Sequence, residues 1–445
     1  MRYLFCFFTA CLITAQPHED LDQFIDSRMN SGYIPGLSAC AIINDQIVWM
    51  NSYGSANLTL DIPVTNNTNF LLASISKLIT TTAIMQIFEN GDILLDDNIN
   101  QYLSFDVINP FYPDIEITPY MLLTHTASIK EDLTFSEEYS IFGNNSEMEL
   151  EYFLSNYFTP GAEFYSSNNF YNSEPGENWQ YSNIGFALIA LLVEHISNQS
   201  FEEYCELNIF EPLAMGETSW HFEGMDETNV AMPYEWMPGM EELGHYFIPY
   251  YPSAQLRSSV SELSTFLRAY MGYMESAAVG IGSQNNVLLA DDTIELILVE
   301  HVNDGWDWNN MSEGWGLGWY YKIINGKEFW GHNGEMWGVL TELFFNKEDK
   351  LGIIILTNGG DYFGSWYNDV MAVEDSILKY VYKHISIIGE LNFDGQINFY
   401  DMEIMIDYLF KETEFTELQN DNADLDYNEN IDIYDLLFII ELYNN

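Results

Sequence analysis

Positively charged residues are scarce in this chain of 445 residues. Lys and Arg together number 13 against 68 Asp and Glu, which gives a formal net charge of −55. Nucleic acids and anionic membrane surfaces repel such a chain, so neither is an expected partner. The scarcity also makes each lysine informative, because few are present to complete a motif by chance.

Cysteine is rare as well, with 4 in the chain. Two of them fall within residues 1–15, where one positive charge, an apolar run and small residues are typical of a secretory signal peptide. The expected location is therefore secreted or periplasmic, and a lipoprotein carrying its lipid on Cys11 is the alternative. Cys40 and Cys205 are too few for a disulfide scaffold, and either a pair or two buried thiols fits them.

Long apolar runs and two familiar catalytic motifs are missing. No segment after residue 15 has an unbroken apolar run long enough to cross a membrane. The chain has neither H-E-x-x-H nor G-x-S-x-G, and its histidines show no metal-ligand spacing. Zinc-dependent hydrolysis and an α/β-hydrolase nucleophile are therefore not indicated.

A serine and a lysine three residues apart stand at the start of an apolar stretch. Residues 71–91 read LLASISKLITTTAIMQIFENG, which predicts a helix that ends near Gly91. Helical spacing puts Ser74 within reach of Lys77. It also puts Ser74 near a helix N-terminus, where free N–H groups favour negative charge. These are the parts of an acyl-transfer site, although Ser-x-x-Lys alone is a weak pattern.

Strand patterns lie at both ends of the first 384 residues, and helical patterns lie between them. This arrangement predicts an α/β (α+β) fold with one antiparallel sheet built from both chain ends, flanked by helices, with an inserted helical subdomain. Residues 131–176 lack a clean period and predict an irregular insertion near the site. The expected strands are 36–43, 46–53, 315–324, 328–339, 340–345 and 351–357.

Residues 386–445 form a separate unit with an internal repeat. GELNFDGQINFYD at 389–401 returns as ADLDYNENIDIYD at 423–435, and an apolar helix follows each copy. The oxygen-bearing residues fall at the ligand positions of EF-hand loops, which predicts a small α-helical domain with paired calcium loops. The predicted ligands are Glu390, Asn392, Asp394, the Gln396 carbonyl, Asn398 and Asp401, then Asp424, Asp426, Asn428, the Asn430 carbonyl, Asp432 and Asp435.

Residues 20–384 resemble the serine beta-lactamase and penicillin-binding protein superfamily, in its class C, DD-peptidase and esterase branch. The motifs that carry the resemblance are Ser74-Ile75-Ser76-Lys77, Leu122-Leu123-Thr124-His125-Thr126, Tyr181-Ser182-Asn183, Phe210-Glu211-Pro212-Leu213 and His332-Asn333-Gly334. Their order and spacing agree with the family. The resemblance implies a transpeptidase-like fold and an acyl-enzyme mechanism that needs no cofactor.

The resemblance also implies roles for individual residues. Ser74 is expected to attack a carbonyl, with Lys77 as base and Tyr181 as proton shuttle. Asn183 is expected to bind Lys77 or the substrate amide. The backbone N–H groups of Ser74 and Glu335, which directly follows the third motif, are expected to form the oxyanion hole. His125 is expected to be structural.

The third motif departs from the beta-lactamases of this group, which have Lys at the position of His332. A histidine is cationic only part of the time near neutral pH, so a substrate carboxylate lacks its fixed partner. The expected function is therefore a secreted serine hydrolase of small ester, peptide or peptidoglycan-type substrates. Esterase or D-amino-acid peptidase activity is favoured over beta-lactamase activity. The alternative is a catalytically weak protein that binds or senses penicillin or peptidoglycan.

The C-terminal repeat resembles a dockerin module, whose loops end in Asp where EF-hand loops carry Glu. The resemblance implies calcium binding and attachment to a cohesin-like protein partner. In the alternative of a weak binding protein, this module is the main functional part. The predicted domains are thus a signal peptide at 1–15, a serine hydrolase domain at 20–384 and a dockerin-like domain at 386–445.

Overall fold

The computed structural model describes most of the chain between residues 19 and 385 and parts of the C-terminal unit. The described residues are 19–43, 46–131, 141–142, 148–272, 288–303, 312–385, 391, 397, 399–411, 415, 422–423, 425 and 430–443. The expected signal peptide at 1–15 lies outside them.

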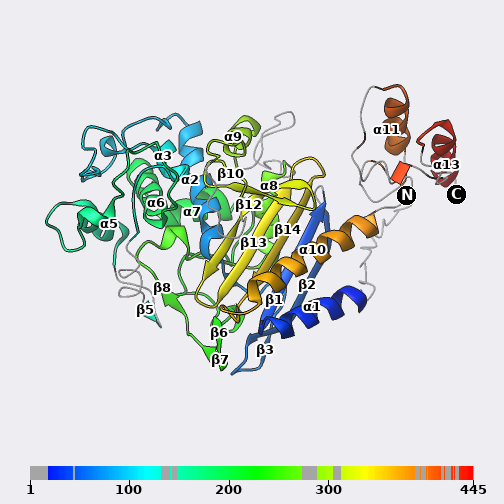
Figure 1. Ribbon diagram of the computed structural model, residues 1–445, viewed down its shortest axis with the longest axis horizontal. Coiled ribbons are helices and arrows are strands. Elements are labelled where there is room, and N and C mark those ends of the chain that lie inside the picture. The colour runs from blue at the N-terminus through cyan, green and yellow to red at the C-terminus, as the bar shows by residue number, and fades with distance from the viewer. Residues whose placement is uncertain are drawn as a thin grey trace, which may run out of the picture.

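One eight-stranded antiparallel sheet forms the centre of the larger unit (Figure 1). The strand near the N-terminus, β1, lies between β2 and β14, so the two chain ends build one sheet as the sequence predicts. The strands in spatial order are β10 (Gly314–Trp315), β11 (Tyr320–Ile324), β12 (Lys327–Met336), β13 (Val339–Asn346), β14 (Leu351–Thr357), β1 (Gly36–Ile43), β2 (Gln46–Asn57) and β3 (Ile62–Pro63).

Both faces of the sheet are buried. Along β14, Ile353 and Ile355 belong to one apolar cluster, while Ile354 and Leu356 belong to another, because successive side chains of a strand point to opposite faces. Figure 1 shows α1 (Glu19–Ser31) and α10 (Trp366–Ile385) lying across the first face. The second face packs against α8 (Val260–Tyr270).

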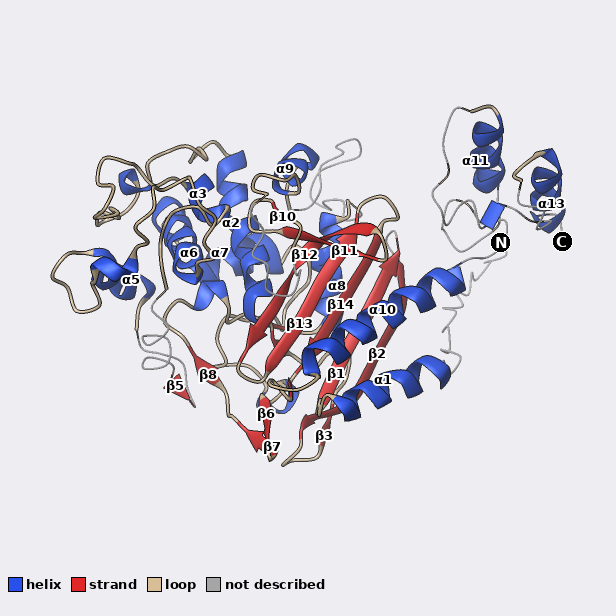
Figure 2. Cartoon of the chain, in the orientation of Figure 1, coloured by secondary structure: helices blue, strands red, loops and turns tan. Residues whose placement is uncertain are grey.

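The other described helices of residues 19–385 gather to one side of the sheet (Figure 2). They are α2 (Ser76–Glu89), α3 (Pro119–Leu123), α5 (Leu150–Phe158), α6 (Asn183–Ser197), α7 (Phe201–Cys205) and α9 (Asp291–Ile297). Cys40 on β1 and Cys205 on α7 are both buried free thiols, which decides between the two alternatives left open by the sequence.

Helix α6 is the central helix of this helical part. Its N-cap Ser182 accepts a hydrogen bond from the Gly185 N–H at 3.0 Å, and its C-cap Asn198 is left-handed with φ 57°. Every residue of 184–193 is buried, so the helix is apolar all round.

No single described helix is long and apolar enough to span a bilayer. The bent pair Asn183–Ser197 and Phe201–Phe210 passes the criterion together, by length and composition alone.

Two local predictions differ from the structure. Residues 131–176 are not wholly irregular, because α5 and the short strand β5 (Ile141–Phe142) lie within them, and β5 pairs with β8 (Tyr246–Phe247). The expected strand 315–324 breaks after Trp315. A Cβ on Gly316 would lie 2.2 Å from the Ile297 carbonyl oxygen, so a close approach of backbones interrupts the strand here.

The remaining short strands form small sheets that are separate from the eight-stranded sheet. In two of these small sheets, β4 pairs with β9, and β6 pairs with both β7 and β15. Their bounds are β4 (Phe70–Leu71), β6 (Tyr234–Met237), β7 (Gly239–Glu242), β9 (Arg257–Ser258) and β15 (Gly359–Gly360).

The C-terminal unit has two described helices, α11 (Phe399–Leu409) and α13 (Ile433–Tyr443), which pack on each other. Their small core joins the residues Leu391, Met402, Met405, Ala423, Leu436 and Ile439. Met402 and Met405 occupy the positions that Leu436 and Ile439 occupy in the second repeat, which agrees with the small helical domain predicted from the repeat.

Candidate active site

Ser74 lies in a tight turn immediately before α2. The turn is the 3₁₀ segment Ala73–Ile75, and Ala73 has a positive φ of 48°, a strained conformation for a residue with a side chain. The α-helix begins only at Ser76, so the nucleophile candidate precedes the helix rather than opening it. Ser74 is half-buried, which leaves its hydroxyl reachable.

Strand β12 holds this turn from the side. A Cβ on Gly334 would lie 2.1 Å from the Leu72 carbonyl oxygen, so only glycine permits the approach. The Thr341 hydroxyl on β13 donates to the same Leu72 carbonyl at 2.8 Å. The third motif therefore positions the backbone just before Ser74.

Two functional groups converge on the Ser74 hydroxyl. Lys77 Nζ lies 3.0 Å from Ser74 Oγ, and the Tyr181 hydroxyl donates to Ser74 Oγ at 2.9 Å. Lys77 lies on α2, and Tyr181 lies in the segment that precedes α6. Residues more than 100 positions apart in the sequence therefore meet at one oxygen atom.

Lys77 is fully buried in spite of its charge. Burial lowers the pKa of Lys77 to about 7, and the negative charge of Glu131 opposes this shift. Its Nζ lies 2.6 Å from Asn183 Oδ1 and 2.8 Å from the Ser253 carbonyl oxygen. A lysine with this pKa is partly neutral at pH 7 and can accept a proton.

Tyr181 is held as a neutral phenol. Burial raises the pKa of its hydroxyl, while the hydrogen bond to Ser74 works in the opposite direction. His125 Nδ1 accepts the backbone N–H of Ser182 at 3.1 Å, and the His125 ring lies 4.4 Å from the Tyr181 ring. These contacts agree with the structural role expected for His125.

The side chains of His332 and Asn333 in the third motif have different surroundings. Burial and the charge of Lys77 lower the pKa of His332 to about 3, so the ring is neutral near pH 7 rather than partly cationic. Its Nδ1–H donates to the Asn333 carbonyl at 2.5 Å. Asn333 Oδ1 accepts a hydrogen bond from the Tyr320 hydroxyl at 3.0 Å, so the Asn333 side chain is bound to the neighbouring strand β11.

Glu335 follows on the same strand and is exposed. The Tyr362 hydroxyl donates to its carboxylate, and this contact raises the pKa of Tyr362 to about 12. The side chain thus places a negative charge at the surface beside the third motif. This arrangement disfavours an anionic group at that end of the site.

Glu131 is a site residue that the sequence reasoning missed. Its Oε2 accepts the Asn183 Nδ2–H at 2.7 Å, and the Tyr250 hydroxyl also donates to it. One carboxylate among 68 acidic residues carries no signal of its own, and a backbone carbonyl such as that of Ser253 carries none at all. Only the position of Glu131, shortly after the Leu122–Thr126 motif, could have suggested a role for this residue.

The calcium-ligand predictions fall on two loops that the structure describes only in part. Asp401 and Asp435 are buried at the ends of their loops, where Asp401 accepts the Leu391 N–H at 2.6 Å and Asp435 accepts the Leu425 N–H at 2.8 Å. The oxygen donors of the two loops suit calcium. Asn430 and Asp432 are also described, whereas Glu390, Asn392, Asp394, Gln396, Asn398, Asp424, Asp426 and Asn428 lie outside the described residues.

No group of three or more His, Cys, Asp or Glu side chains that could hold a metal ion occurs within the described parts of the chain. Four of the twelve predicted ligands, Asp401, Asn430, Asp432 and Asp435, lie in those parts.

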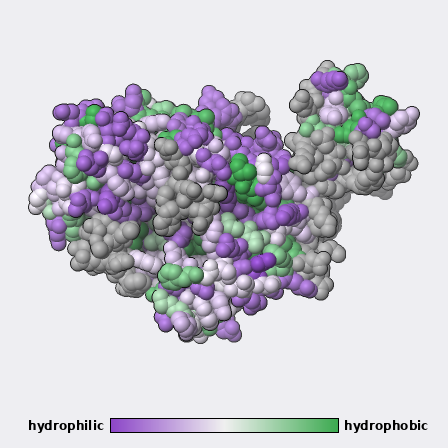
Figure 3. Space-filling model, in the orientation of Figure 1, coloured by the Kyte–Doolittle hydropathy of each residue, from purple (hydrophilic) through white to green (hydrophobic). Residues whose placement is uncertain are grey.

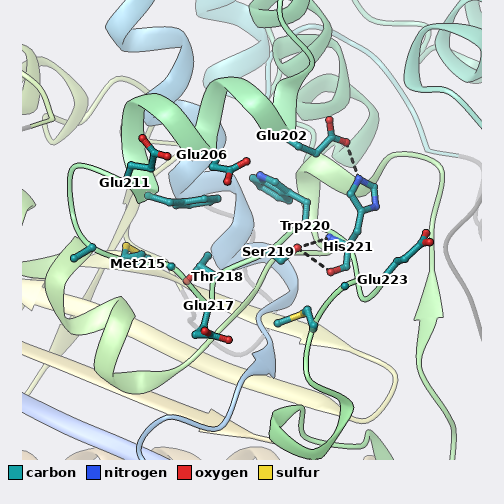
Figure 4. Close-up of a pocket in the computed structure, with 15 residues that line it drawn as sticks. Glu202, Glu206, Glu211, Met215, Glu217, Thr218, Ser219, Trp220, His221 and Glu223 are labelled. Atoms are coloured by element: carbon teal, nitrogen blue, oxygen red, sulfur yellow. Dashed lines mark hydrogen bonds and ion pairs between the residues drawn. The ribbon is translucent and has the colours of Figure 1, made fainter.

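A separate pocket of about 500 Å³ opens beside α7 (Figure 4). Glutamates line much of it, and His221 Nε2 lies 2.7 Å from Glu202 Oε1 at its edge. None of the residues predicted for acyl transfer lines this pocket. The pocket is therefore separate from the Ser74 cluster, where the nucleophile and base candidates lie.

Parts of this chain are similar in sequence to known proteins. Protein flp of Staphylococcus aureus is 25% identical over 223 residues, which are 50% of this chain and 42% of that protein. Penicillin-binding protein 4* of Bacillus subtilis is 29% identical over 178 residues, 39% of this chain and 35% of that protein. The matched segments thus span less than half of these curated relatives.

Solved structures share the fold. A penicillin-binding protein homologue from Pyrococcus abyssi aligns with a TM-score of 0.64 at 23% identity, covering 84% of this chain and 81% of that one. The D-amino acid amidase from Ochrobactrum anthropi, in complex with D-phenylalanine, aligns with a TM-score of 0.65 at 17% identity, covering 81% and 99%.

Two family models match the sequence itself. The model described as Dockerin type I domain matches residues 388–442. The model described as Beta-lactamase matches residues 21–372, which is most of the chain. The chain therefore belongs to the beta-lactamase family and carries a C-terminal dockerin type I domain.

Proposed function

We propose that this protein is a secreted serine hydrolase that cleaves ester or amide bonds through an acyl-enzyme on Ser74. The observation that carries the proposal is the convergence of Lys77 Nζ and the Tyr181 hydroxyl on Ser74 Oγ, at 3.0 and 2.9 Å. A nucleophile with a buried, weakly basic amine at hydrogen-bond distance is the arrangement that activates a serine.

The mechanism uses these groups in turn. Neutral Lys77 accepts the Ser74 proton as Ser74 attacks the substrate carbonyl. Tyr181 passes a proton to the leaving group and then activates the water that releases the acyl group. The backbone N–H groups of Ser74 and Glu335 stabilise the oxyanion, and the Gly334 contact with Leu72 supports their approach.

The charges of the site indicate the substrate class. A neutral His332 and an exposed Glu335 carboxylate offer no fixed cation for a substrate carboxylate. We infer that neutral esters and amides are better substrates than beta-lactams or peptides with a free C-terminal carboxylate. Amides of D-amino acids are included, because a D-amino acid amidase shares the fold.

A substrate panel tests the proposal. The full chain, loaded with calcium, is incubated with p-nitrophenyl esters, D-phenylalanine amide, D-alanyl peptides and nitrocefin. Turnover of the esters or the amide at a higher kcat/KM than nitrocefin is the expected result. A folded protein that takes up a fluorophosphonate at Ser74 but turns over none of these would instead be a binding or sensing protein.

Replacing His332 by lysine is expected to restore preference for anionic substrates. The new ammonium group provides the missing counter-charge, so the ratio of kcat/KM for a carboxylate-bearing ester to that for a neutral ester should rise about tenfold. His332→Gln is the matched control, because it changes the side chain without adding charge. Equal ratios for the Lys and Gln variants would show that this position does not face the substrate.

The dockerin domain adds an attachment function. Phe399 and Tyr400 precede Asp401 just as Ile433 and Tyr434 precede Asp435, and all four apolar side chains are exposed. Figure 3 shows hydrophobic surface on this pair of helices. We propose that the unit binds a cohesin-like partner outside the cell, with residues 1–15 acting as the signal peptide.

Calcium removal is expected to unfold the dockerin domain without affecting catalysis. The two loops end in buried carboxylates, Asp401 and Asp435, whose burial without a cation is costly. After treatment with EDTA, amide hydrogen exchange in α11 and α13 should approach that of an unfolded chain, while ester turnover stays the same. EDTA saturated with calcium is the control, and unchanged protection in the metal-free protein would argue against calcium-coupled folding.

A further inference from the structure

The three partners of the Lys77 amine differ in what they can do with a proton. Asn183 Oδ1 and the Ser253 carbonyl, at 2.6 and 2.8 Å, can only accept hydrogen bonds. Ser74 Oγ, at 3.0 Å, can accept or donate. A neutral amine keeps two N–H groups and one lone pair, so the two obligate acceptors take both N–H groups. The lone pair then faces the Ser74 hydroxyl.

This distribution depends on which way the Asn183 amide points. With its oxygen toward Lys77, Asn183 accepts, but a flipped amide would direct N–H groups at the lysine and compete for the lone pair. The Glu131 carboxylate decides the direction. An ionised carboxylate accepts only, and Asn183 Nδ2 donates to its Oε2 at 2.7 Å.

Glu131 is itself held in place. The Tyr250 hydroxyl donates to its carboxylate, and Tyr250 directly precedes the turn Tyr251–Ser253, whose last carbonyl accepts from Lys77. The Thr80 hydroxyl on α2 donates to the Pro252 carbonyl at 2.7 Å and fixes this turn against the helix that bears Lys77. The carboxylate, the amide and the carbonyl are thus parts of one connected arrangement.

We propose that Glu131 is a positioning residue of the acyl-transfer site. Its carboxylate sets the direction of the Asn183 amide and so aims the lone pair of Lys77 at Ser74. It also supplies the negative charge that balances the ammonium ion formed when Lys77 takes the Ser74 proton. The proposal rests on the hydrolase function proposed above, and no bond to Glu131 forms or breaks during the reaction.

The charge balance around Lys77 supports the second role. The titratable groups that influence it in the described part of the chain are Glu131, His125, His332 and Tyr181. Burial lowers the pKa of His125 and of His332 and raises that of Tyr181, so these three are neutral near pH 7. Burial also raises the pKa of Glu131, but the hydrogen bonds from Tyr250 and Asn183 and the charge of Lys77 oppose this. The carboxylate of Glu131, which accepts hydrogen bonds from Asn183 and Tyr250, is therefore the group placed to balance the charge of Lys77.

The test compares Glu131→Gln, Glu131→Asp and the wild type as full chains loaded with calcium. The rate at which a fluorophosphonate modifies Ser74 is followed by intact mass between pH 5 and 9. Glutamine is isosteric but neither charged nor an obligate acceptor, so the rate at pH 8 should fall about tenfold or more. Loss of the opposing charge should also lower the pKa of Lys77, moving the midpoint of the acidic limb down by about one unit.

This shift distinguishes positioning from a structural defect. A loosened fold lowers the rate at every pH, whereas loss of the Glu131 charge moves the midpoint to lower pH. Glu131→Asp keeps the charge but shortens the side chain, so it should keep the wild-type midpoint with a severalfold lower rate. Glu177→Gln removes an exposed carboxylate from the loop before Tyr181. This variant should match the wild type in both the modification rate and the midpoint of the acidic limb.

Several outcomes would overturn the proposal. An unchanged midpoint in Glu131→Gln, or an equal shift in Glu177→Gln, would do so while leaving the hydrolase function intact. If Glu131→Gln does not fold, the test rests on Glu131→Asp. A wild-type modification rate in Glu131→Asp would overturn the proposal. A wild type that the fluorophosphonate does not modify at Ser74 would overturn both this proposal and the hydrolase function.

Discussion

Replacing Ser74 by alanine is expected to abolish hydrolysis, lowering kcat/KM for the best ester substrate by about four to six orders of magnitude. The oxygen at which Lys77 and Tyr181 converge is removed, and no acyl-enzyme can form. The measurement is p-nitrophenol release, with intact mass after exposure to a fluorophosphonate. The variant should gain no adduct, whereas the wild type gains one.

Ser76 provides the matched control for this prediction. It lies two residues further along, but it is buried and its Oγ accepts the Leu256 N–H at 3.1 Å. Ser76→Ala should keep the adduct on Ser74 and lose about 1–3 kcal/mol of stability, because the buried Leu256 N–H loses its acceptor. An adduct on Ser74→Ala, or turnover close to that of the wild type, would show that another residue is the nucleophile.

The sequence predicts the sheet because its central strands are buried on both faces. Leu351–Thr357 and Gly36–Ile43 are nearly continuous apolar runs, and runs of this kind are recognisable without knowledge of their neighbours. The break after Trp315 could not be predicted, because its cause is the carbonyl of Ile297, which tertiary packing brings to Gly316. Likewise, α5 is short and lies within a polar, aromatic segment that masks its period.

The site shows the same division between local pattern and tertiary contact. The spacing of Ser74 and Lys77 is a local pattern, and the structure brings both to Tyr181 and Asn183 as the motif order suggests. The role of Glu131 depends on a contact across 52 positions, which no spacing encodes. The charge state of His332 depends on burial, and a motif specifies the residue but not its exposure.

Lys322 is the site of the largest expected effect on stability. It lies on β11 with its Nζ 2.8 Å from Glu342 of β13 and 2.9 Å from Glu374 of α10, and both carboxylates are buried. The Lys322→Ala substitution leaves these two like charges facing each other without a cation. We expect a loss of about 3–5 kcal/mol in the free energy of unfolding at pH 8, measured by urea denaturation with calcium present.

Lys379→Ala is the matched control, because Lys379 also pairs with a carboxylate, that of Asp375 at 2.5 Å, but at an exposed position on α10. Its loss should be about 0.5 kcal/mol or less. A similar loss in both variants would show that the Lys322 cluster behaves as a surface pair.

The loss in Lys322→Ala should also depend on pH, in a direction that the buried carboxylates determine. Burial already raises the pKa of Glu342 in the wild type, and Lys322 opposes the shift. Without Lys322 the folded-state pKa rises further above its unfolded value of about 4.3. The folded variant then binds more protons than the unfolded chain, so its stability is greatest at low pH and is lost as the pH rises. The loss in free energy of unfolding relative to the wild type should therefore be smaller at pH 5 than at pH 8. An equal loss at the two pH values would mean that the carboxylates reach solvent once the lysine is gone.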